Sequence, residues 1–299
     1  AYLKCTGRAD VAELADEVAM DLRADAEVEA NPEQYYDQCI TINLDELTPY
    51  VNGPFTPDAA CQVSEMAAKV KNENLPQQVD VCLIGSCTNS SYQDMARAAS
   101  VVKSMLAAGH ALKSQLIVCP GSELVRTTAE RDGILDVFVK AGATIMTNAC
   151  GPCIGQWKRE NPHPERPNSI VTSFNRNFAK RADGNPNTYA FVASPETAVG
   201  YAFTGDLTKH PSFVPELNCC MPQGEALPAN GYASDAACVQ AIKPAYNIQP
   251  DASVEVEIKP DSERLQRLQP FAAWNGEDFQ QLPLLIKAKG KCTTDHISM

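Results

Sequence analysis

The feature that most constrains the fold is the alternation of short apolar runs with amphipathic stretches between residues 79 and 192. The apolar runs lie at 79–84, 115–119, 143–146, 169–172 and 188–192. Two of the intervening stretches begin at a serine, and each ends at or close to a glycine; they are Ser91–Ala108 and Ser122–Arg131. Strands that alternate with helices indicate βαβ units. We therefore expect an α/β fold with a mainly parallel sheet flanked by helices.

The ends of the chain have a different pattern. Apolar residues at helical spacing predict a helix over 10–23, and alternation predicts a strand over 39–44. The stretch 211–281 is rich in proline and has no sustained periodicity, which predicts a long linker. We expect four regions, namely the C-terminal part of a preceding α/β domain at 1–49, an α/β domain at 50–210, the linker at 211–281, and the start of a truncated further domain, opened by a strand near 284–286, at 282–299. The chain begins at Ala1 and stops in a polar turn, so we expect a piece of a longer protein.

Charge and composition exclude several classes of protein. The 37 acidic residues against 25 basic ones give a net charge of −12, which disfavours nucleic-acid and anionic membrane partners. No apolar run approaches the roughly 18 residues that a membrane span requires. The 12 cysteines are too sparse for a disulfide scaffold in a chain of 299 residues, so we expect a reducing compartment. Most of these cysteines need no role beyond packing.

Residues that can carry chemistry follow the ends of three expected strands. Ligands of open parallel sheets bind beyond the carboxyl ends of the strands. Cys87 follows the first strand, and Cys150 with Cys153 follows the strand at 143–146. Arg176 and Arg181 follow the strand at 169–172. The pattern predicts three thiols and two guanidinium groups on one rim of the sheet.

The pair Cys150 and Cys153 taken alone permits a redox or structural motif, an iron-sulfur site, or no role. A thioredoxin-like site is disfavoured because Ala149 stands where that motif has tryptophan and Asn161-Pro162 breaks the chain soon afterwards. A zinc site needs a fourth ligand, and none of the four histidines has paired-ligand spacing with another. The third cysteine, Cys87, favours the iron-sulfur site over the other interpretations. Three thiolates can hold three irons of a [4Fe-4S] cluster and leave the fourth open as a Lewis acid.

Three motifs together resemble the aconitase (aconitate hydratase) family, of the mitochondrial type. They are Gly-Ser-Cys-Thr-Asn-Ser at 85–90, Asn-Ala-Cys-Gly-Pro-Cys-Ile-Gly at 148–155 and Ser-Phe-Asn-Arg-Asn-Phe at 173–178. Residues 289–298 are similar to the start of that family's swivelling C-terminal domain. The resemblance runs along nearly the whole chain and is strongest between 79 and 207.

The resemblance implies roles for individual residues. Cys87, Cys150 and Cys153 would be the ligands of a [4Fe-4S] cluster in which one iron lacks a protein ligand. Arg176 and Arg181 would bind substrate carboxylates, with Asn175 beside them. The family's catalytic serine base belongs to the C-terminal domain, so this chain would hold no catalytic residue and would be inactive alone.

The resemblance also implies a reaction and a setting. The reaction is the isomerisation of citrate to isocitrate through cis-aconitate by dehydration and rehydration, with a tricarboxylate as the small-molecule partner. We expect a monomer in the mitochondrial matrix, or alternatively in a bacterial cytoplasm. A homoaconitase or a methylcitrate-type dehydratase would share the chemistry. A cluster-free RNA-binding regulator and a thiol oxidoreductase are the alternatives of a different class.

Overall fold

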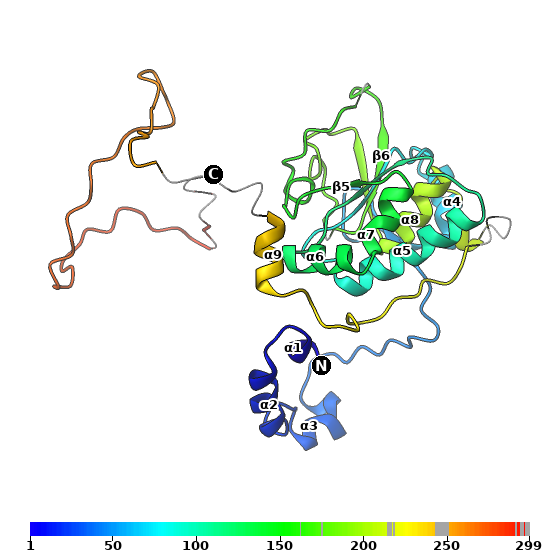
Figure 1. Ribbon diagram of the computed structural model, residues 1–299, viewed down its shortest axis with the longest axis horizontal. Helices are drawn as coiled ribbons and strands as arrows, with labels where there is room; N and C mark the ends of the chain where they lie inside the picture. Colours follow the sequence, from blue (N-terminus) through cyan, green and yellow to red (C-terminus); the bar gives the residue numbers. More distant parts are fainter. Residues whose placement is uncertain are drawn as a thin grey trace. The chain divides into compact units, whose positions relative to one another are not determined.

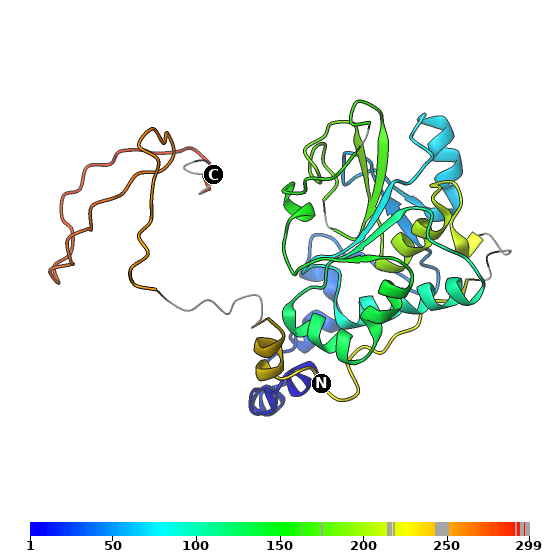
Figure 2. The ribbon, with the colours of Figure 1, turned by 45° about the horizontal axis from the view of Figure 1, so that its top comes forward.

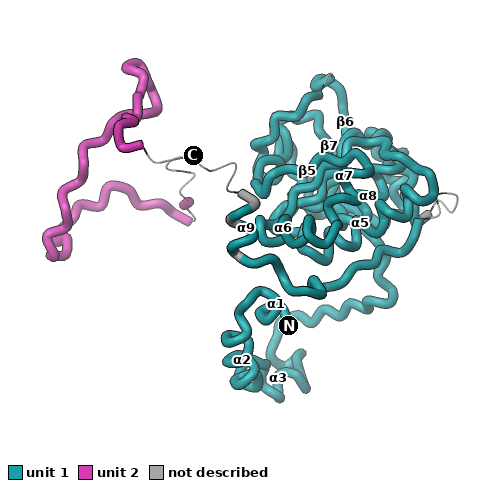
Figure 3. The backbone as a smooth tube through the Cα atoms, viewed as in Figure 1, with its two compact units in different colours: residues 1–247 teal, residues 248–299 magenta. Residues whose placement is uncertain are grey.

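The computed structural model describes residues 1–161, 163–174, 176–213, 217, 219–242, 251–290, 292–293 and 296. Contacts divide the chain into two units, Ala1–Asn247 and Ile248–Met299 (Figure 3). The described residues of the second unit contain no α-helix or strand. The boundaries expected near residues 50, 211 and 282 stay predictions.

The first unit is built on one mostly parallel sheet (Figures 1 and 2). Its strands are β1 (Tyr50–Asn52), β2 (Ala60–Gln62), β3 (Val81–Ile84), β4 (Gln115–Val118), β5 (Thr144–Ile145), β6 (Asn168–Thr172) and β7 (Thr188–Val192). Within the described residues the seven strands follow the order β2-β1-β7-β6-β3-β4-β5. β1 pairs antiparallel with β2 and β7, whereas β3 to β7 are parallel. The predicted α/β class is confirmed, and all five strands expected between residues 79 and 192 form.

The first unit also contains helices. They are α1 (Tyr2–Cys5), α2 (Ala9–Glu17), α3 (Ala26–Ala30), α4 (Met66–Asn72), α5 (Tyr92–Ala107), α6 (Glu123–Arg131), α7 (Ile134–Lys140), α8 (Pro195–Thr204) and α9 (Asp235–Ile242), with short 3-10 helices η1 (Pro32–Gln34), η2 (Val63–Glu65), η3 (Pro152–Ile154) and η4 (Pro211–Phe213). Ser91 and Asp94 form a reciprocal capping box at the start of α5, which confirms that predicted helix. The hydroxyl of Ser122 accepts the Val125 N–H at 3.2 Å and caps α6.

The two faces of the sheet are covered differently. Side chains of one face, such as Cys82, Ile84 and Phe191, pack with helices α5, α7 and α8 in the larger core cluster. Side chains of the other face, such as Leu83, pack instead with residues of the segments that follow β5 and β6. Those partners are Met146, Cys153, Trp157, Phe174 and Ala182. The motif-bearing segments therefore form the covering layer of one sheet face.

Three local predictions are wrong. The expected strand at 39–44 is irregular, and its apolar side chains Ile40, Ile42 and Leu44 are 82%, 65% and 76% exposed. Alternation favours a strand only where a partner strand and an apolar surface are present, and no described element supplies either. The expected helix at 10–23 ends at Glu17. Residues 284–286 form no strand, for the same reason as 39–44.

Part of the expected linker is attached to the helices. Ser104 Oγ of α5 accepts the Cys220 N–H at 3.0 Å, and Thr128 Oγ1 of α6 accepts the Ala233 N–H at 2.9 Å. Helix α9 also lies within this stretch and packs on α6. The described residues in the first half of the expected linker therefore include contacts with α5 and α6. Among the described residues no helix has the length and apolar character to cross a membrane.

Candidate metal centre

The carboxyl ends of the parallel strands lie in one row. Ile84 of β3 pairs with Val118 of β4, which pairs with Ile145 of β5. On the other side of β3, Leu83 pairs with Thr172 of β6. The turns that begin at the next residue of each strand therefore start side by side, as the parallel arrangement predicts.

The turn after β3 is held by Ser173, which follows β6. Ser173 Oγ accepts the Gly85 N–H at 2.9 Å and lies 2.7 Å from the Gly85 carbonyl, to which it can donate. A β-carbon at Gly85 would stand 2.8 Å from the Phe174 ring, so a larger residue does not fit. Cys87 lies two residues further along and is exposed. The turn thus presents one thiol to solvent at the sheet edge.

The segment after β5 presents two more thiols. Cys150 is exposed, and Cys153 is half-buried in η3, where it packs against the smaller core cluster. The Cys150 carbonyl accepts the Ile154 N–H at 2.9 Å and closes the turn between the two thiols. Gly155 then has φ +80°, and a β-carbon there would lie 3.1 Å from the Arg181 carbonyl oxygen. Glycine therefore permits the cysteine turn to pack directly on the segment that carries Arg181.

Cys119 directly follows β4, between the strands whose turns carry the motif thiols. Burial raises the pKa of the Cys119 thiol, a backbone hydrogen bond of Ala149 lowers it, and Cys150, Cys153 and Cys87 each raise it. β4 lies between β3 and β5 in the sheet, and Cys119 Sγ lies 3.1 Å from the Thr147 carbonyl in the segment that leads to Cys150. The turns that carry the three cysteines therefore begin at the same edge of the sheet, one on each side of the end of β4.

Neither motif arginine is engaged by an acidic side chain that the structure describes. Arg176 is exposed, and Arg181 is half-buried with its Nε buried and lacking a hydrogen-bond partner among those residues. No described acidic side chain therefore neutralises either guanidinium group. Asn175, the third expected substrate residue, lies outside the described residues.

Two other residues of the Ser-Phe-Asn-Arg-Asn-Phe motif have structural roles that the sequence reasoning missed. Ser173 holds the β3 turn, as described above. Asn177 is buried, and its Nδ2 donates to the carbonyls of Thr56 at 2.9 Å and Asn52 at 3.3 Å. It ties the arginine segment to the β1–β2 hairpin. Burial of polar side chains within a motif cannot be recognised from one sequence, so no signal was available.

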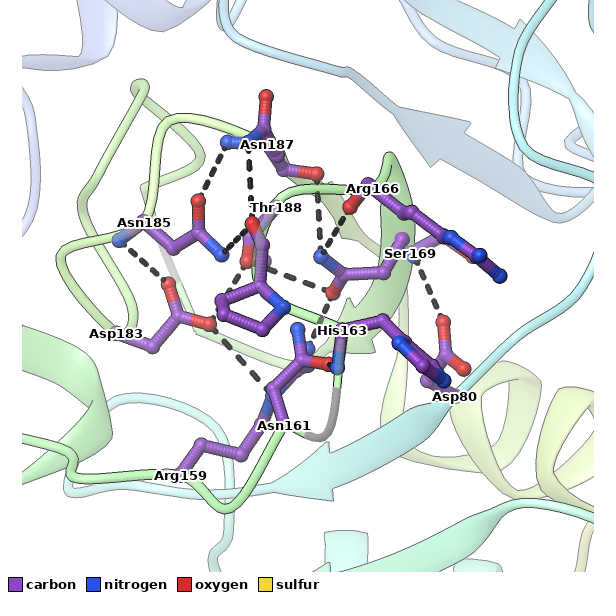
Figure 4. A network of polar contacts seen from close by, with 12 residues as sticks. Asp80, Arg159, Asn161, His163, Arg166, Ser169, Asp183, Asn185, Asn187 and Thr188 are labelled. Atoms are coloured by element: carbon purple, nitrogen blue, oxygen red, sulfur yellow. Dashed lines mark hydrogen bonds and ion pairs between the residues drawn. The ribbon is translucent and has the colours of Figure 1, made fainter.

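A polar network at the opposite edge of the sheet anchors the far ends of both motif segments (Figure 4). Arg159 Nε lies 3.6 Å from Asp183 Oδ2, and the two side chains are only 6% and 3% exposed. Arg159 also donates to Asn168 at the start of β6, and Thr188 of β7 donates to Asp183 at 2.8 Å. The segment after Cys153 and the segment after Arg181 are therefore fastened to each other and to the sheet.

The thiol rim is neither a site for a single metal ion nor part of the cavity found in the first unit. Across the described ranges, no three His, Cys, Asp or Glu side chains lie close enough together to hold one ion. A cavity of about 730 Å³ lies between α5, α8 and the segments around Leu47 and Cys220, and none of the motif cysteines or arginines lines it.

Comparison with known proteins identifies the family. The model of the Aconitase family (aconitate hydratase) matches residues 1–205, which include all the motif cysteines and arginines. The chain belongs to the aconitase family. It is 50% identical over its whole length to the mitochondrial aconitate hydratase of Gracilaria gracilis. It is 48% identical to that of Saccharomyces cerevisiae and 46% identical to the probable mitochondrial enzyme of Dictyostelium discoideum.

The aconitase relatives are longer proteins. The chain covers 38% of each of those three relatives, while each match covers 100% of the chain. The family expected from the three motifs is therefore confirmed. The comparisons do not assign the individual site residues.

Proposed function

We propose that this chain is the cluster-binding part of an aconitate hydratase, with Cys87, Cys150 and Cys153 as the three ligands of a [4Fe-4S] cluster. The observation that carries the proposal is that the turns bearing the three thiols follow β3 and β5, the two neighbours of β4, at the same edge of the sheet. Because each thiolate of such a cluster ligates a different iron, the three sulfurs need not approach as closely as ligands of a single ion. The absence of a single-ion site among the described residues is consistent with this arrangement.

The polar surroundings of the cysteine turns fit an anionic cluster. Ser86 Oγ and Asn148 Oδ1 are buried next to the cysteine turns and have no hydrogen-bond partner among the described residues. Glycines 151 and 155 leave room at the cysteine turn. Polar groups and backbone amides that approach the sulfurs stabilise such clusters and tune them.

The two arginines supply the substrate-binding half of the proposal. When bound, the cluster would supply a Lewis-acidic iron without a protein ligand. Arg176 and Arg181 would bind and orient the carboxylates of a tricarboxylate, because a planar guanidinium can meet a carboxylate with two parallel hydrogen bonds. In a chain of net charge −12, local cations without acidic partners are needed to attract such an anion. Asn175 would lie beside them.

For the whole protein we propose the reversible isomerisation of citrate to isocitrate through cis-aconitate, in the mitochondrial matrix. The relatives that carry this name and location are the support for it. A homoaconitase or methylcitrate-type dehydratase is the variant that changes only the substrate. This chain alone would be inactive, because it contains no residue that we assign as the catalytic base.

Anaerobic reconstitution with iron and sulfide tests the ligand assignment. Cys87→Ala, Cys150→Ala and Cys153→Ala should each prevent stable cluster formation, measured as iron, acid-labile sulfide and visible absorbance. Cys220→Ala, an exposed cysteine outside the motifs, is the matched control and should retain the cluster. Cys119→Ala should also retain it. Loss of the cluster in Cys119→Ala with an intact fold would show that the ligand set is wrong.

Calorimetric titration of the reconstituted chain with citrate tests the arginines. Arg181→Ala should weaken citrate binding about tenfold, or roughly 1.4 kcal/mol, and Arg181→Lys should not restore it because lysine lacks the fork. Arg166→Ala removes the same charge at the opposite sheet edge and should leave binding unchanged. If the Arg181 and Arg166 variants weaken citrate binding equally, Arg181 contributes only its long-range charge and does not contact the ligand.

A further inference from the structure

The connection between β4 and α6, residues 119–123, supplies none of the proposed ligands, yet it contacts the segment that leads to Cys150. Cys119 Sγ lies 3.1 Å from the Thr147 carbonyl and 3.4 Å from the Ala149 carbonyl. Glu123 Oε2 accepts a hydrogen bond from Asn148 Nδ2 at 2.8 Å. β4 lies between β3 and β5 in the sheet, so this connection lies between the two cysteine-bearing turns.

Glu123 is itself held firmly in the first turn of α6. Arg126 Nε lies 2.9 Å from both Glu123 carboxylate oxygens, and Arg126 Nη2 donates to Oε1 at 2.6 Å. Thr127 Oγ1 is a further donor, 3.2 Å from Oε1. The Glu123 and Arg126 side chains are 24% and 22% exposed, so solvent competes little for these bonds. The carboxylate therefore offers Asn148 an acceptor of fixed position.

We propose that Glu123 and Asn148 are positioning residues that set the Cys150 turn before a cluster binds. This proposal rests on the proposed function for the identity of the bound group. Asn148 stands two residues before Cys150, and a side chain anchored there restricts the backbone that carries the thiol. Ordering a ligand segment in advance lowers the entropic cost of binding, and loss of such outer partners typically weakens metal binding 10–100-fold.

Asn148 also has a second polar atom directed at no described partner. Its Oδ1 is buried and unsatisfied, while its Nδ2 is committed to Glu123. A purely structural tether would satisfy both ends of the amide, because a buried polar atom without a partner costs free energy. The orphaned oxygen is the reason to assign the pair to the site rather than to the stability of α6 alone.

Hydrogen exchange of the cluster-free chain measures the positioning directly. In Glu123→Ala and Asn148→Ala, the peptide spanning 147–157 should exchange at least about threefold faster, while the peptide spanning 85–92 should not change. Glu123→Gln keeps an acceptor for Asn148 and should show a smaller effect. Glu130→Ala is the matched control, because Glu130 binds Arg126 at 2.8 Å, is 58% exposed and has no contact with Asn148.

Cluster retention supplies the second measurement. After reconstitution, chelator-driven loss of absorbance should be about tenfold faster in Glu123→Ala and Asn148→Ala than in the wild type and in Glu130→Ala. Equal acceleration of both peptides, or no change in 147–157 in a folded Glu123→Ala variant, would overturn the positioning role. A wild-type chain that takes up no iron and sulfide would count against the proposed function instead, and the exchange ratio would still decide on Glu123 and Asn148.

Discussion

The buried ion pair between Arg159 and Asp183 offers a sharp test of how the site segments are held. The perturbation is Arg159→Met, which keeps an unbranched side chain in the position beside Trp157 but removes the charge and its hydrogen bonds. Asp183 would remain as a carboxylate that is 3% exposed with no cation opposite it. Its remaining partners are the Thr188 hydroxyl at 2.8 Å and the Asn185 N–H at 3.0 Å.

Breaking a buried ion pair by removing one partner costs about 3–5 kcal/mol. We expect the lower end, because Asp183 keeps two hydrogen bonds and because Arg159 Nη1 already lacks a partner among the described residues. A loss of about 3 kcal/mol corresponds to a fall in Tm of about 6–12 °C for a unit of this size.

Urea unfolding followed by circular dichroism, with thermal melts in parallel, measures the effect. Arg166→Met is the matched control, because the Arg166 side chain is 71% exposed and, among the described residues, its one ion pair is with the exposed Glu165 at 3.6 Å. It should change the free energy of unfolding by less than about 0.5 kcal/mol. If the free energy of unfolding of Arg159→Met lies within about 1 kcal/mol of the wild-type value, the ion pair does not hold the two segments together.

Three further predictions concern stability. Burial lowers the pKa of His210 from its ordinary 6.5 to about 4, so the unfolded chain binds a proton before the folded chain does as the pH falls. The free energy of unfolding should therefore decrease by about 1 kcal/mol between pH 7.5 and 5.5. In urea unfolding at each pH, His210→Gln should lose this contribution to the pH dependence. Gly155→Ala places a β-carbon at φ +80° and 3.1 Å from the Arg181 carbonyl oxygen. It should lower the free energy of unfolding by at least about 1–2 kcal/mol, measured from the denaturant midpoint. An unchanged midpoint would show that the turn can move. Ser91→Ala removes the capping box of α5 and should cost about 1 kcal/mol in the same assay, with no change contradicting the cap.

Local sequence patterns predicted the elements that depend little on which other elements lie beside them. The run at 79–84 yields β3, all of whose residues are buried, so its apolar character alone is sufficient. The caps of α5 and α6 involve only neighbouring residues, which is why a serine at the start and a glycine near the end located both helices. The strand expected at 39–44 failed because half-buried alternation depends on a partner strand, which the local pattern does not specify. The hairpin of β1 and β2 was missed because its strands are only three residues each.

The sequence by itself determined which residue types stand at the carboxyl ends of the strands, and so named Cys87, Cys150, Cys153, Arg176 and Arg181 as candidates. Only the tertiary structure decided what surrounds them. The order of strands places β4 between the cysteine turns and brings Glu123 to Asn148, 25 positions apart in the chain. The network around Arg159 likewise joins segments that follow different strands. The physical reason is that these contacts depend on which strands become neighbours, and strand order is set by packing over the whole sheet rather than by any local run of residues.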